Sequence, residues 1–374
     1  MKAGQNNNSL RVAVVGLGGI AALHLQAIAA ARGVQLAAVC DLNTELVAAQ
    51  AAAQAVPGFA DMSKMLAEIR PDMVTVATDT RSHAKLTMMA ARAGVRAVHC
   101  EKPMAVHPAE AREMVAACSA AGTLLTINHQ RRLGDVAAAR RFIAGGGIGE
   151  VLELRGYCAG DLLGDGTHVI DSLLALAGDP AVSGVLGALD VSTVKERYGH
   201  PVENGAHLEI RTDHALQMSI ATGSFADRRA YQEYHVLGSR GSLWRAGDIL
   251  KPNWFVADGT PGTHAPVFDR QRWFTHPELA SHGGPWRPLD IGITDACGGE
   301  VAAYEQIAAS LATGAPHPLD GQRTLTVQGV IMAGYQSGLT HQPVTLAEAA
   351  ALEQFPLRLE HGKPYAGPAI ENPR

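Results

Sequence analysis

A chain of 374 residues is too long for one ordinary hydrophobic core, so two domains are expected. With 47% hydrophobic and 18% charged residues, the composition is that of a globular protein and excludes wholesale disorder. The formal net charge of −5, without any basic run that carries interleaved aromatic residues, argues against a nucleic-acid partner, which requires a basic surface.

Cysteine spacing and hydropathy indicate whether the protein binds a metal, is secreted or spans a membrane. The chain has no Cys or His cluster with zinc spacing, so no metal site is expected. The polar N-terminal stretch lacks the apolar segment of a secretory signal, and no apolar run is long enough to cross a bilayer. We therefore expect a cytoplasmic protein. Its five widely spaced cysteines should be reduced thiols: Cys40, Cys100, Cys118, Cys158 and Cys297.

Residues 11 to about 125 alternate short apolar runs with alanine-rich stretches, which is the pattern of β-α-β units and a parallel sheet. The predicted strands are Arg11–Val15, Gln35–Cys40, Met73–Ala77, Ala97–Cys100 and Leu124–Ile127. The predicted helices between them are Ile20–Ala31, Thr44–Gln54, Ser63–Ile69, His83–Ala93 and Pro108–Ala121.

After about residue 150 the pattern changes to longer strands, several with the alternation of a half-exposed antiparallel sheet. Lys251–Asp290, rich in Pro, Gly, Trp and His, is expected to be a long loop. The predicted strands are Val151–Tyr157, His207–Thr212, Leu216–Thr222 and Tyr231–Val236, and two helices are predicted at Asp295–Ala312 and Arg323–Leu339.

A glycine-rich turn follows the first predicted strand and opens the next helix. Gly16, Gly18 and Ala21 form the pattern GxGxxA, in which Gly16 permits a tight turn and Gly18 lets the backbone approach a pyrophosphate. Ala21 allows close packing of helix and strand. Gly19 and Ile20 lie where the amides at the helix N-terminus would face the anion. The turn predicts a dinucleotide site.

Asp41 ends the second predicted strand, about twenty residues after the turn, where a carboxylate can accept hydrogen bonds from both ribose hydroxyls of the adenosine. It would repel a 2′-phosphate, and no Arg directly follows it. We therefore expect NAD rather than NADP. Residues 1–127 are expected to form the NAD-binding Rossmann domain and residues 128–374 the substrate-binding and oligomerisation domain, with one C-terminal helix packing back on the first.

A Glu-Lys-Pro turn, Glu101–Pro103, stands at the carboxyl end of a predicted parallel strand, where ligands bind in open α/β sheets. An ammonium group beside a reacting hydroxyl can share its proton, which makes Lys102 a catalytic candidate.

With the segments GLGGIA, VATDTRSHAKL, CEKPMA, GTHVIDSLLALAGD and EYHVLGSRGSLW, the sequence resembles the Gfo/Idh/MocA oxidoreductase family over nearly its whole length. That family includes glucose–fructose oxidoreductase and inositol 2-dehydrogenase. The resemblance implies an α/β protein: a Rossmann domain, then an α/β domain with a large, open, mostly antiparallel sheet that mediates homodimers or homotetramers.

The resemblance also implies roles for residues of the first domain. Lys102 would lie between nicotinamide and substrate, hydrogen-bonded to the reacting hydroxyl, and the bond to Pro103 would be cis. Glu101 would orient Lys102 or contact the cofactor. Thr78 and His83 would belong to the cofactor site.

The family pattern GxHxxD matches His168 and Asp171, expected on the first helix of the C-terminal domain. His168 would be the general base or proton relay, and Asp171 an orienting acid. Many family members carry an aspartate four residues before the histidine, but here that position is Gly164. Asp161 and Asp165 are both near, and either could assist His168 or bind a sugar hydroxyl.

Two further segments are candidates for substrate contact. Asn128–Arg132 follows the last strand of the first domain, and it contains His129 and Arg131. The tandem arginines could bind an acidic substrate group or cap the next helix. Trp286 and Arg287 could stack on a sugar and hydrogen-bond it.

Together these features predict reversible hydride transfer between NAD and a secondary hydroxyl of a sugar, sugar derivative or inositol. Two alternatives share the residues. One is a glycoside-cleaving enzyme that uses transiently reduced, internally recycled NAD. The other is a non-catalytic NAD-binding regulator.

Overall fold

In the computed structural model the described part of the chain divides into two compact units. The first contains residues within Met1–Ala105, Ala109–Gly134 and Thr294–Leu325, and the second those within Val106–Pro108, Asp135–Ile293 and Thr326–Arg374. This division differs from the expected boundary after residue 127, because the second unit takes over at Asp135 and a later segment returns to the first. The described residues are 9–193, 195–197, 199–213, 216–226, 232–246, 272–276, 287–289, 299–357, 359–360 and 363–364.

The first unit is built on a parallel six-stranded sheet of order β3-β2-β1-β4-β5-β6. Its strands are β1 (Leu10–Val15), β2 (Val34–Cys40), β3 (Gly58–Phe59), β4 (Met73–Val76), β5 (Ala97–Cys100) and β6 (Leu124–Ile127). Its helices are α1 (Ala21–Ala30), α2 (Thr44–Gln54), α3 (Met62–Ile69), α4 (Thr80–Arg92), α5 (Pro108–Ala121), the short η1 (Gln130–Leu133) and α8 (Glu300–Thr313).

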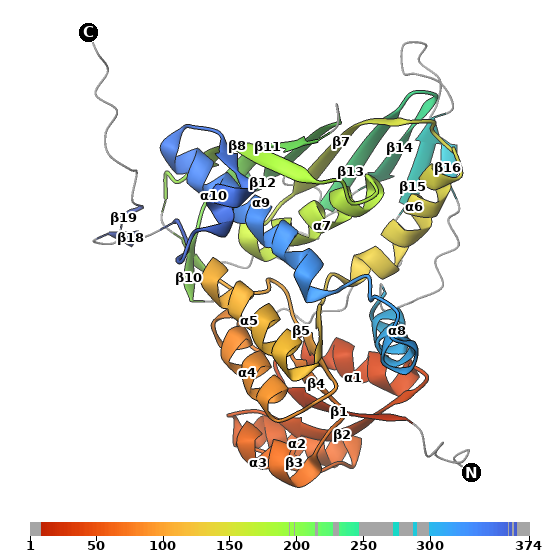
Figure 1. Ribbon diagram of the computed structural model, residues 1–374, viewed down its shortest axis with the longest axis vertical. Helices are drawn as coiled ribbons and strands as arrows, with labels where there is room; N and C mark the ends of the chain where they lie inside the picture. Colours follow the sequence, from red (N-terminus) through yellow and green to blue (C-terminus); the bar gives the residue numbers. More distant parts are fainter. Residues whose placement is uncertain are drawn as a thin grey trace. The chain divides into compact units, whose positions relative to one another are not determined.

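Both faces of this sheet are buried, as a parallel sheet requires. Along β1, Val12 and Val14 face a core that includes α1 and α8, while Ala13 and Val15 face the core under α3, α4 and α5. Figure 1 shows the blue helix α8 beside the red helix α1, and their side chains pack together although the two helices are far apart in the sequence.

The second unit is built on a mixed nine-stranded sheet of order β16-β15-β14-β13-β7-β12-β11-β8-β17, and of its described strand pairs only β7–β12 is parallel. Its strands are β7 (Val151–Cys158), β8 (Val182–Asp190), β11 (Gly205–Thr212), β12 (Gln217–Thr222), β13 (Gln232–Gly238), β14 (Gly241–Ala246), β15 (Arg272–His276), β16 (Arg287–Leu289) and β17 (Val344–Thr345). Two small hairpins are β9 (Lys195–Arg197) with β10 (His200–Val202), and β18 (Leu359–Glu360) with β19 (Lys363–Pro364).

Helices cover one face of this sheet and form the largest core. Gly156 in β7 leaves space for Val169 and Leu173 of α7 (Thr167–Leu176), since a Cβ at that position would clash with the Val169 side chain. The helical elements are α6 (Asp135–Ala144), the π-helical turn η2 (Leu162–Gly166), α7 (Thr167–Leu176), η3 (Gly223–Phe225), α9 (Gly321–Thr340), which begins in the first unit, and α10 (Leu346–Ala350).

The expected fold class is confirmed: a Rossmann-type parallel sheet is followed by an α/β unit with a large, mostly antiparallel sheet. Two further expectations are corrected. Lys251–Asp290 is not a loop throughout, because β15 and β16 extend the sheet within it, and its other residues lie outside the described part. The helix of His168, α7, is preceded in the second unit by α6, so it is not the first.

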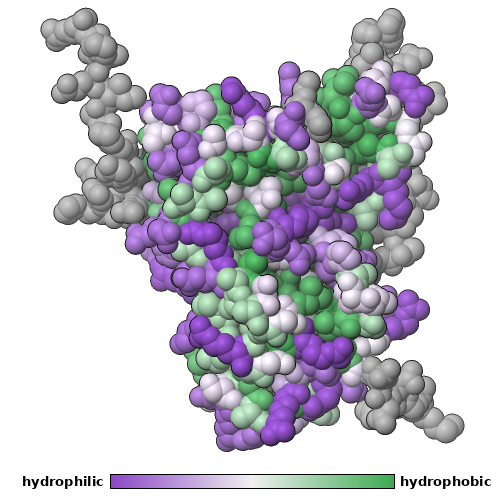
Figure 2. All heavy atoms as spheres, viewed as in Figure 1, coloured by the Kyte–Doolittle hydropathy of each residue, from purple (hydrophilic) through white to green (hydrophobic). Residues whose placement is uncertain are grey.

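The face shown in Figure 2 has hydrophilic and hydrophobic residues interspersed over the described parts of both units. Among the residues that the structure describes, no helix combines the length and apolar character that a membrane span requires.

Candidate active site

The glycine turn between β1 and α1 has the geometry that the sequence predicts. Gly16 has a φ of +91°, and a Cβ there would clash with the carbonyl oxygen of Ala77, so no other residue fits. At Gly18 a Cβ would meet no atom within 4 Å, which leaves the backbone open to an approaching ligand. Gly18, Gly19 and Ile20 are exposed at the N-terminus of α1. The turn therefore fits a pyrophosphate, which accepts hydrogen bonds from such amides.

Asp41 lies against this turn. Its Oδ2 accepts a hydrogen bond of 2.6 Å from the backbone N–H of Leu17, and its Oδ1 accepts one of 2.8 Å from Asn43. Strand β2 ends just before Asp41, so the parallel pairing of β1 with β2 brings the acid and the turn together. This arrangement holds a carboxylate next to the site where the adenosine ribose of a dinucleotide would bind.

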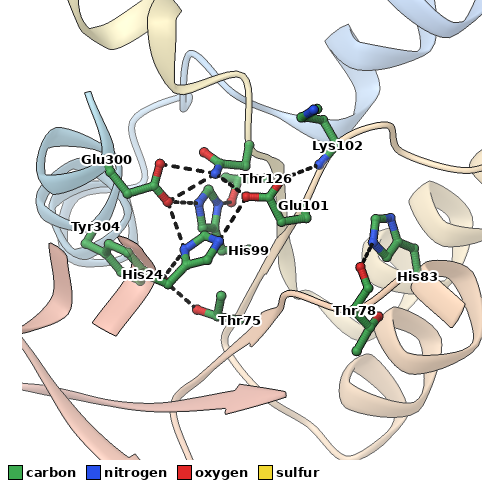
Figure 3. Close-up of polar contacts among 11 residues, drawn as sticks. His24, Thr75, Thr78, His83, His99, Glu101, Lys102, Thr126, Glu300 and Tyr304 are labelled. Atoms are coloured by element: carbon green, nitrogen blue, oxygen red, sulfur yellow. Dashed lines mark hydrogen bonds and ion pairs between the residues drawn. The ribbon is translucent and has the colours of Figure 1, made fainter. Parts of the chain in front are cut away.

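The Glu-Lys-Pro turn follows β5, and the Lys102–Pro103 bond is cis. Glu101 turns inward: its Oε2 accepts the backbone N–H of Lys102 at 3.1 Å, whereas its Oε1 faces His24 and Asn128. The Lys102 side chain points away from His24 (Figure 3). Glu101 thus fixes the backbone from which the Lys102 ammonium extends.

Thr78 and His83 lie on the other side of the same loops. The ring of His83 is buried, with Nδ1 2.9 Å from the carbonyl oxygen of Pro103 and Nε2 3.2 Å from that of Thr78. Burial lowers the pKa of His83, despite the opposing effect of these carbonyls. The Thr78 methyl group lies close to Gly16, since a Cβ added to that glycine would be 2.8 Å from it. His83 therefore joins the β4 and β5 loops and is not presented at the surface.

Beneath these loops lies a buried polar cluster that the sequence did not predict (Figure 3). His24 of α1 is its centre: Nε2 is 3.0 Å from Glu101 Oε1, and Nδ1 is 2.8 Å from Glu300 Oε1. Tyr304 OH is 2.9 Å from His24 Nδ1 and 2.9 Å from Thr75 Oγ1. The amide of Asn128 donates to Glu101 at 2.7 Å and to both oxygens of Glu300 at 3.1 Å.

The charges in this cluster stabilise one another. Burial alone would lower the pKa of His24, but the charges and hydrogen bonds of Glu300 and Glu101 raise it to about 10. Burial opposes ionisation of both carboxyls, yet the hydrogen bonds and charge of His24 hold the pKa of Glu101 and of Glu300 below the usual range. These shifts all favour an imidazolium between two carboxylates.

Among the described residues, His24, His99 and Glu300 are also the one group with metal-ligand spacing, with ligand atoms within 4.8 Å of one another. The contacts of His24 to Glu101 and Glu300 are at hydrogen-bond distance, and His99 Nδ1 is engaged by Thr126 Oγ1 at 2.8 Å. We interpret the group as a hydrogen-bonded ion cluster, because these contacts need no bridging cation.

The segment after β6, Asn128–Arg132, is buried. Asn128 joins the cluster described above, while His129, Arg131 and Arg132 lie in or beside η1 with little exposure. The η1 turn meets the start of α8, because a Cβ at Gly299 would clash with the carbonyl oxygen of Gln130.

In the second unit, His168 lies in the first turn of α7, directly after the π-helical turn η2. Its side chain is buried, and so is that of Asp171 one turn later. Both residues belong to the second unit, whereas Lys102 belongs to the first.

Asp161 and Asp165 are both bound by Arg197 of β9, a residue that sequence reasoning missed. One guanidinium nitrogen, Nη1, is 2.7 Å from Asp161 Oδ2 and 2.6 Å from Asp165 Oδ2. Asp161 also accepts the N–H of Gly164 through Oδ1, which closes the η2 turn. The sequence offers no signal for Arg197, because the short hairpin that contains it has no periodic pattern.

Glu203 is a second residue near these aspartates that sequence reasoning missed. It accepts a hydrogen bond of 2.6 Å from the backbone N–H of Leu162 and another of 2.6 Å from Tyr335 OH. Burial, with the charge of Asp161, raises the pKa of Glu203 to about 7. Trp286 lies outside the described residues, and so does the side chain of Arg287 in β16.

Comparisons with known proteins identify the class that this fold and these motifs define, an NAD-binding oxidoreductase. The model described as "Oxidoreductase family, NAD-binding Rossmann fold" matches residues 10–129, and "Oxidoreductase family, C-terminal alpha/beta domain" matches residues 155–346. The chain belongs to the Gfo/Idh/MocA oxidoreductase family.

Named relatives are similar to the chain over different lengths. D-glucoside 3-dehydrogenase of Escherichia coli is 32% identical over 211 residues, which are 50% of this chain and 59% of that relative. D-apiose dehydrogenase of Paraburkholderia graminis is 27% identical over 91% of this chain and 92% of its own. A solved levoglucosan dehydrogenase in complex with NADH and levoglucosan has a TM-score of 0.74 and 20% identity over 90% of this chain and 99% of its own, which shows a shared fold.

Proposed function

We propose that this protein is an NAD-dependent dehydrogenase that transfers a hydride from a secondary hydroxyl carbon of a sugar, sugar derivative or inositol. The observation that carries the proposal is the placement of Lys102 at the carboxyl end of β5, with its backbone N–H bound by Glu101, in the unit that holds the glycine turn. Two relatives are named as dehydrogenases of a D-glucoside and of D-apiose, which supports a carbohydrate substrate.

The proposed division of labour follows from the chemistry of each group. NAD, when bound, would accept the hydride. Lys102 hydrogen-bonds the reacting hydroxyl and holds its carbon in place, while His168 removes the hydroxyl proton as general base. Histidine is the side chain that ordinarily gains and loses a proton near neutral pH, which suits His168 to this role.

The contacts of the two aspartates favour Asp165 as the partner of His168. Both oxygens of Asp161 have structural bonds, one to Gly164 and one to Arg197, so we assign it to holding the η2 turn. Asp165 precedes His168 by one turn and is oriented by Arg197. His129 and Arg131 remain proposed substrate contacts.

For the cofactor we propose NAD over NADP, because the carboxylate of Asp41 beside the turn would repel a 2′-phosphate. Asp41→Asn keeps an acceptor for the Leu17 N–H and removes the charge. We expect the ratio of kcat/KM for NAD to that for NADP to fall by about tenfold, which corresponds to about 1.4 kcal/mol. Steady-state rates with each cofactor measure it. An unchanged ratio would contradict this role.

The activity test is the absorbance of NADH after mixing the purified protein with NAD and a panel of glucosides, apiose, inositols and levoglucosan. Lys102→Met should abolish any substrate-dependent rise. Lys85→Met, at an exposed lysine of α4, is the matched control and should leave the rise intact.

Product analysis in parallel separates the alternatives. A glycoside that is consumed without NADH accumulation would indicate a cleavage enzyme with internally recycled NAD. If NAD binds but no substrate is consumed, the regulator alternative replaces the proposed dehydrogenase.

We also propose that the face of the nine-stranded sheet opposite its helices joins copies of the chain into a homodimer or homotetramer. On this face Glu233 accepts hydrogen bonds from Trp244 Nε1 at 2.8 Å and contacts His235 at 2.7 Å. The ring of Tyr157 stands edge-on to that of His235. Such aromatic, polar surfaces are typical of interfaces. Light scattering of the purified protein tests it, and a monomer would refute it.

A further inference from the structure

The cluster around His24 contains more charge than the packing of the first unit requires. His24 and Glu300 are each 0% exposed, and Glu101 is also buried. Removing ions from water is energetically costly, and apolar residues of similar volume often give equal or greater stability. A fully buried ion cluster is therefore a poor device for stability alone, and its contacts suggest what else it does.

The contacts of Glu101 link the cluster to Lys102. One carboxylate oxygen, Oε1, lies 3.0 Å from His24 Nε2 and accepts a hydrogen bond of 2.7 Å from the Asn128 amide. The other, Oε2, accepts a hydrogen bond of 3.1 Å from the Lys102 N–H. Because the carboxylate is planar, a rotation that breaks the first set also moves the second. The position of the Lys102 backbone thus depends on what holds Oε1.

Groups from several elements hold His24. Glu300 and Tyr304 of α8 and Glu101, which follows β5, contact its ring, and Thr75 of β4 contacts Tyr304 OH in turn. The ring of His99, in β5, stands edge-on to that of His24, and its Nε2 is 3.7 Å from Glu300. His24 itself lies in α1, one turn after the glycine turn.

We infer that His24 and Glu300 are positioning residues for Lys102, holding the Glu101 carboxylate in the orientation that receives the Lys102 N–H. Neither residue contacts substrate in this assignment. The inference extends the proposed function, since Lys102 is the hydroxyl-binding group of that proposal. It also links helix α1, whose N-terminus carries the glycine turn, to the Glu-Lys-Pro turn through the single side chain of His24.

The test compares His24→Gln and Glu300→Gln with Glu305→Gln. Glu305 is the matched control, because it lies in the same helix α8 but pairs with the exposed Arg32. The first readout needs no substrate: backbone hydrogen exchange of the full-length, ¹⁵N-lysine-labelled protein by NMR. The Lys102 signal is assigned by its absence in Lys102→Met, and Lys64 and Lys85 serve as internal references.

In both cluster variants we expect the Lys102 amide to exchange at least about tenfold faster relative to the references, with no change in Glu305→Gln. The second readout is a split of kinetic constants. We expect kcat to fall by about tenfold or more, and KM for the sugar to change by less than about threefold, because the loss concerns orientation and not binding.

Folded variants in which Lys102 exchange and kcat match the control would overturn the inference. If His24→Gln does not fold, Glu300→Gln decides, because it keeps the side-chain volume and removes the charge that holds His24 and Asn128, the two groups that contact Glu101 Oε1. If wild-type protein turns over no sugar, the proposed function fails, but the exchange readout still decides whether the cluster positions Lys102.

Discussion

The two units each contain a cation held between two carboxylates, but the two clusters differ in their access to water. In the first unit, His24 is 0% exposed and lies between Glu101 and Glu300. In the second, the Arg197 side chain is 36% exposed while Asp161 and Asp165 are buried. Water can replace a lost partner in the second cluster but not in the first. The same charge pattern should therefore have a different energetic weight in each unit.

The largest effect is expected from His24→Leu, which leaves Glu101 and Glu300 buried without their cation. Breaking such a group should lower the free energy of unfolding by about 3–5 kcal/mol. Denaturant unfolding followed by circular dichroism measures it. Glu305→Gln is the control and should unfold with the wild-type midpoint. A wild-type midpoint for His24→Leu would show that the buried charge is unimportant.

Glu203, beside the second cluster, should make stability depend on pH, because its pKa of about 7 lies above the ordinary value. The folded state thus binds this proton more tightly, so the contribution of Glu203 to stability is complete below about pH 4.5 and is lost as pH rises through 7. Glu203→Gln should gain stability relative to wild type across that window, on the order of 3 kcal/mol. Unfolding at pH 5 and pH 8 measures the difference, and a pH-independent difference would refute it.

Arg197→Met should have a smaller effect than His24→Leu. Asp161 and Asp165 lose a shared partner at a site that water reaches, so we expect a cost of about 1–2 kcal/mol. Arg140→Met, which breaks a pair with Asp179 on the surface of α6, is the control. Unfolding midpoints compare the two. A cost for Arg197→Met equal to that of His24→Leu would remove the distinction between the clusters.

The smallest expected difference is in salt dependence. In 1 M NaCl, the loss of unfolding free energy caused by Arg197→Met should be smaller than at low salt, by less than about 1 kcal/mol. The reason is that ions screen a half-exposed charge. The cost of His24→Leu should stay constant, since salt does not reach a buried pair. Repeating both unfolding series at low and high salt tests this, and equal salt dependence would contradict the difference in access.

Local patterns in the sequence predicted much of the first unit. Five strands and five helices were expected near their observed bounds, because a strand buried on both faces is a short apolar run that glycine and polar residues delimit. The need for glycine at Gly16 was predictable for the same reason, since it follows from the conformation of a single local turn. The short strand β3, with two residues, has no such pattern and was missed.

What the sequence could not predict depends on residues far apart in the chain. His24 and Glu300 meet because α8 returns to the first unit, and nothing in the local pattern around Glu300 indicates this partner. Arg197 and Glu203 were missed likewise, since each is one charged residue in a short, irregular stretch. Buried charges in general look like surface residues in a sequence, because only tertiary packing distinguishes them.

The return of α8 to the first unit has a consequence for the order of folding during synthesis. His24 and Glu101 leave the ribosome with the first third of the chain, but Glu300 and Tyr304 follow about two hundred residues later. Until then the face of the sheet that Tyr304 and Ile307 cover is without part of its core, and the carboxylate of Glu101 has an incomplete set of partners. The unit that begins the chain is therefore completed only after most of the other has been made.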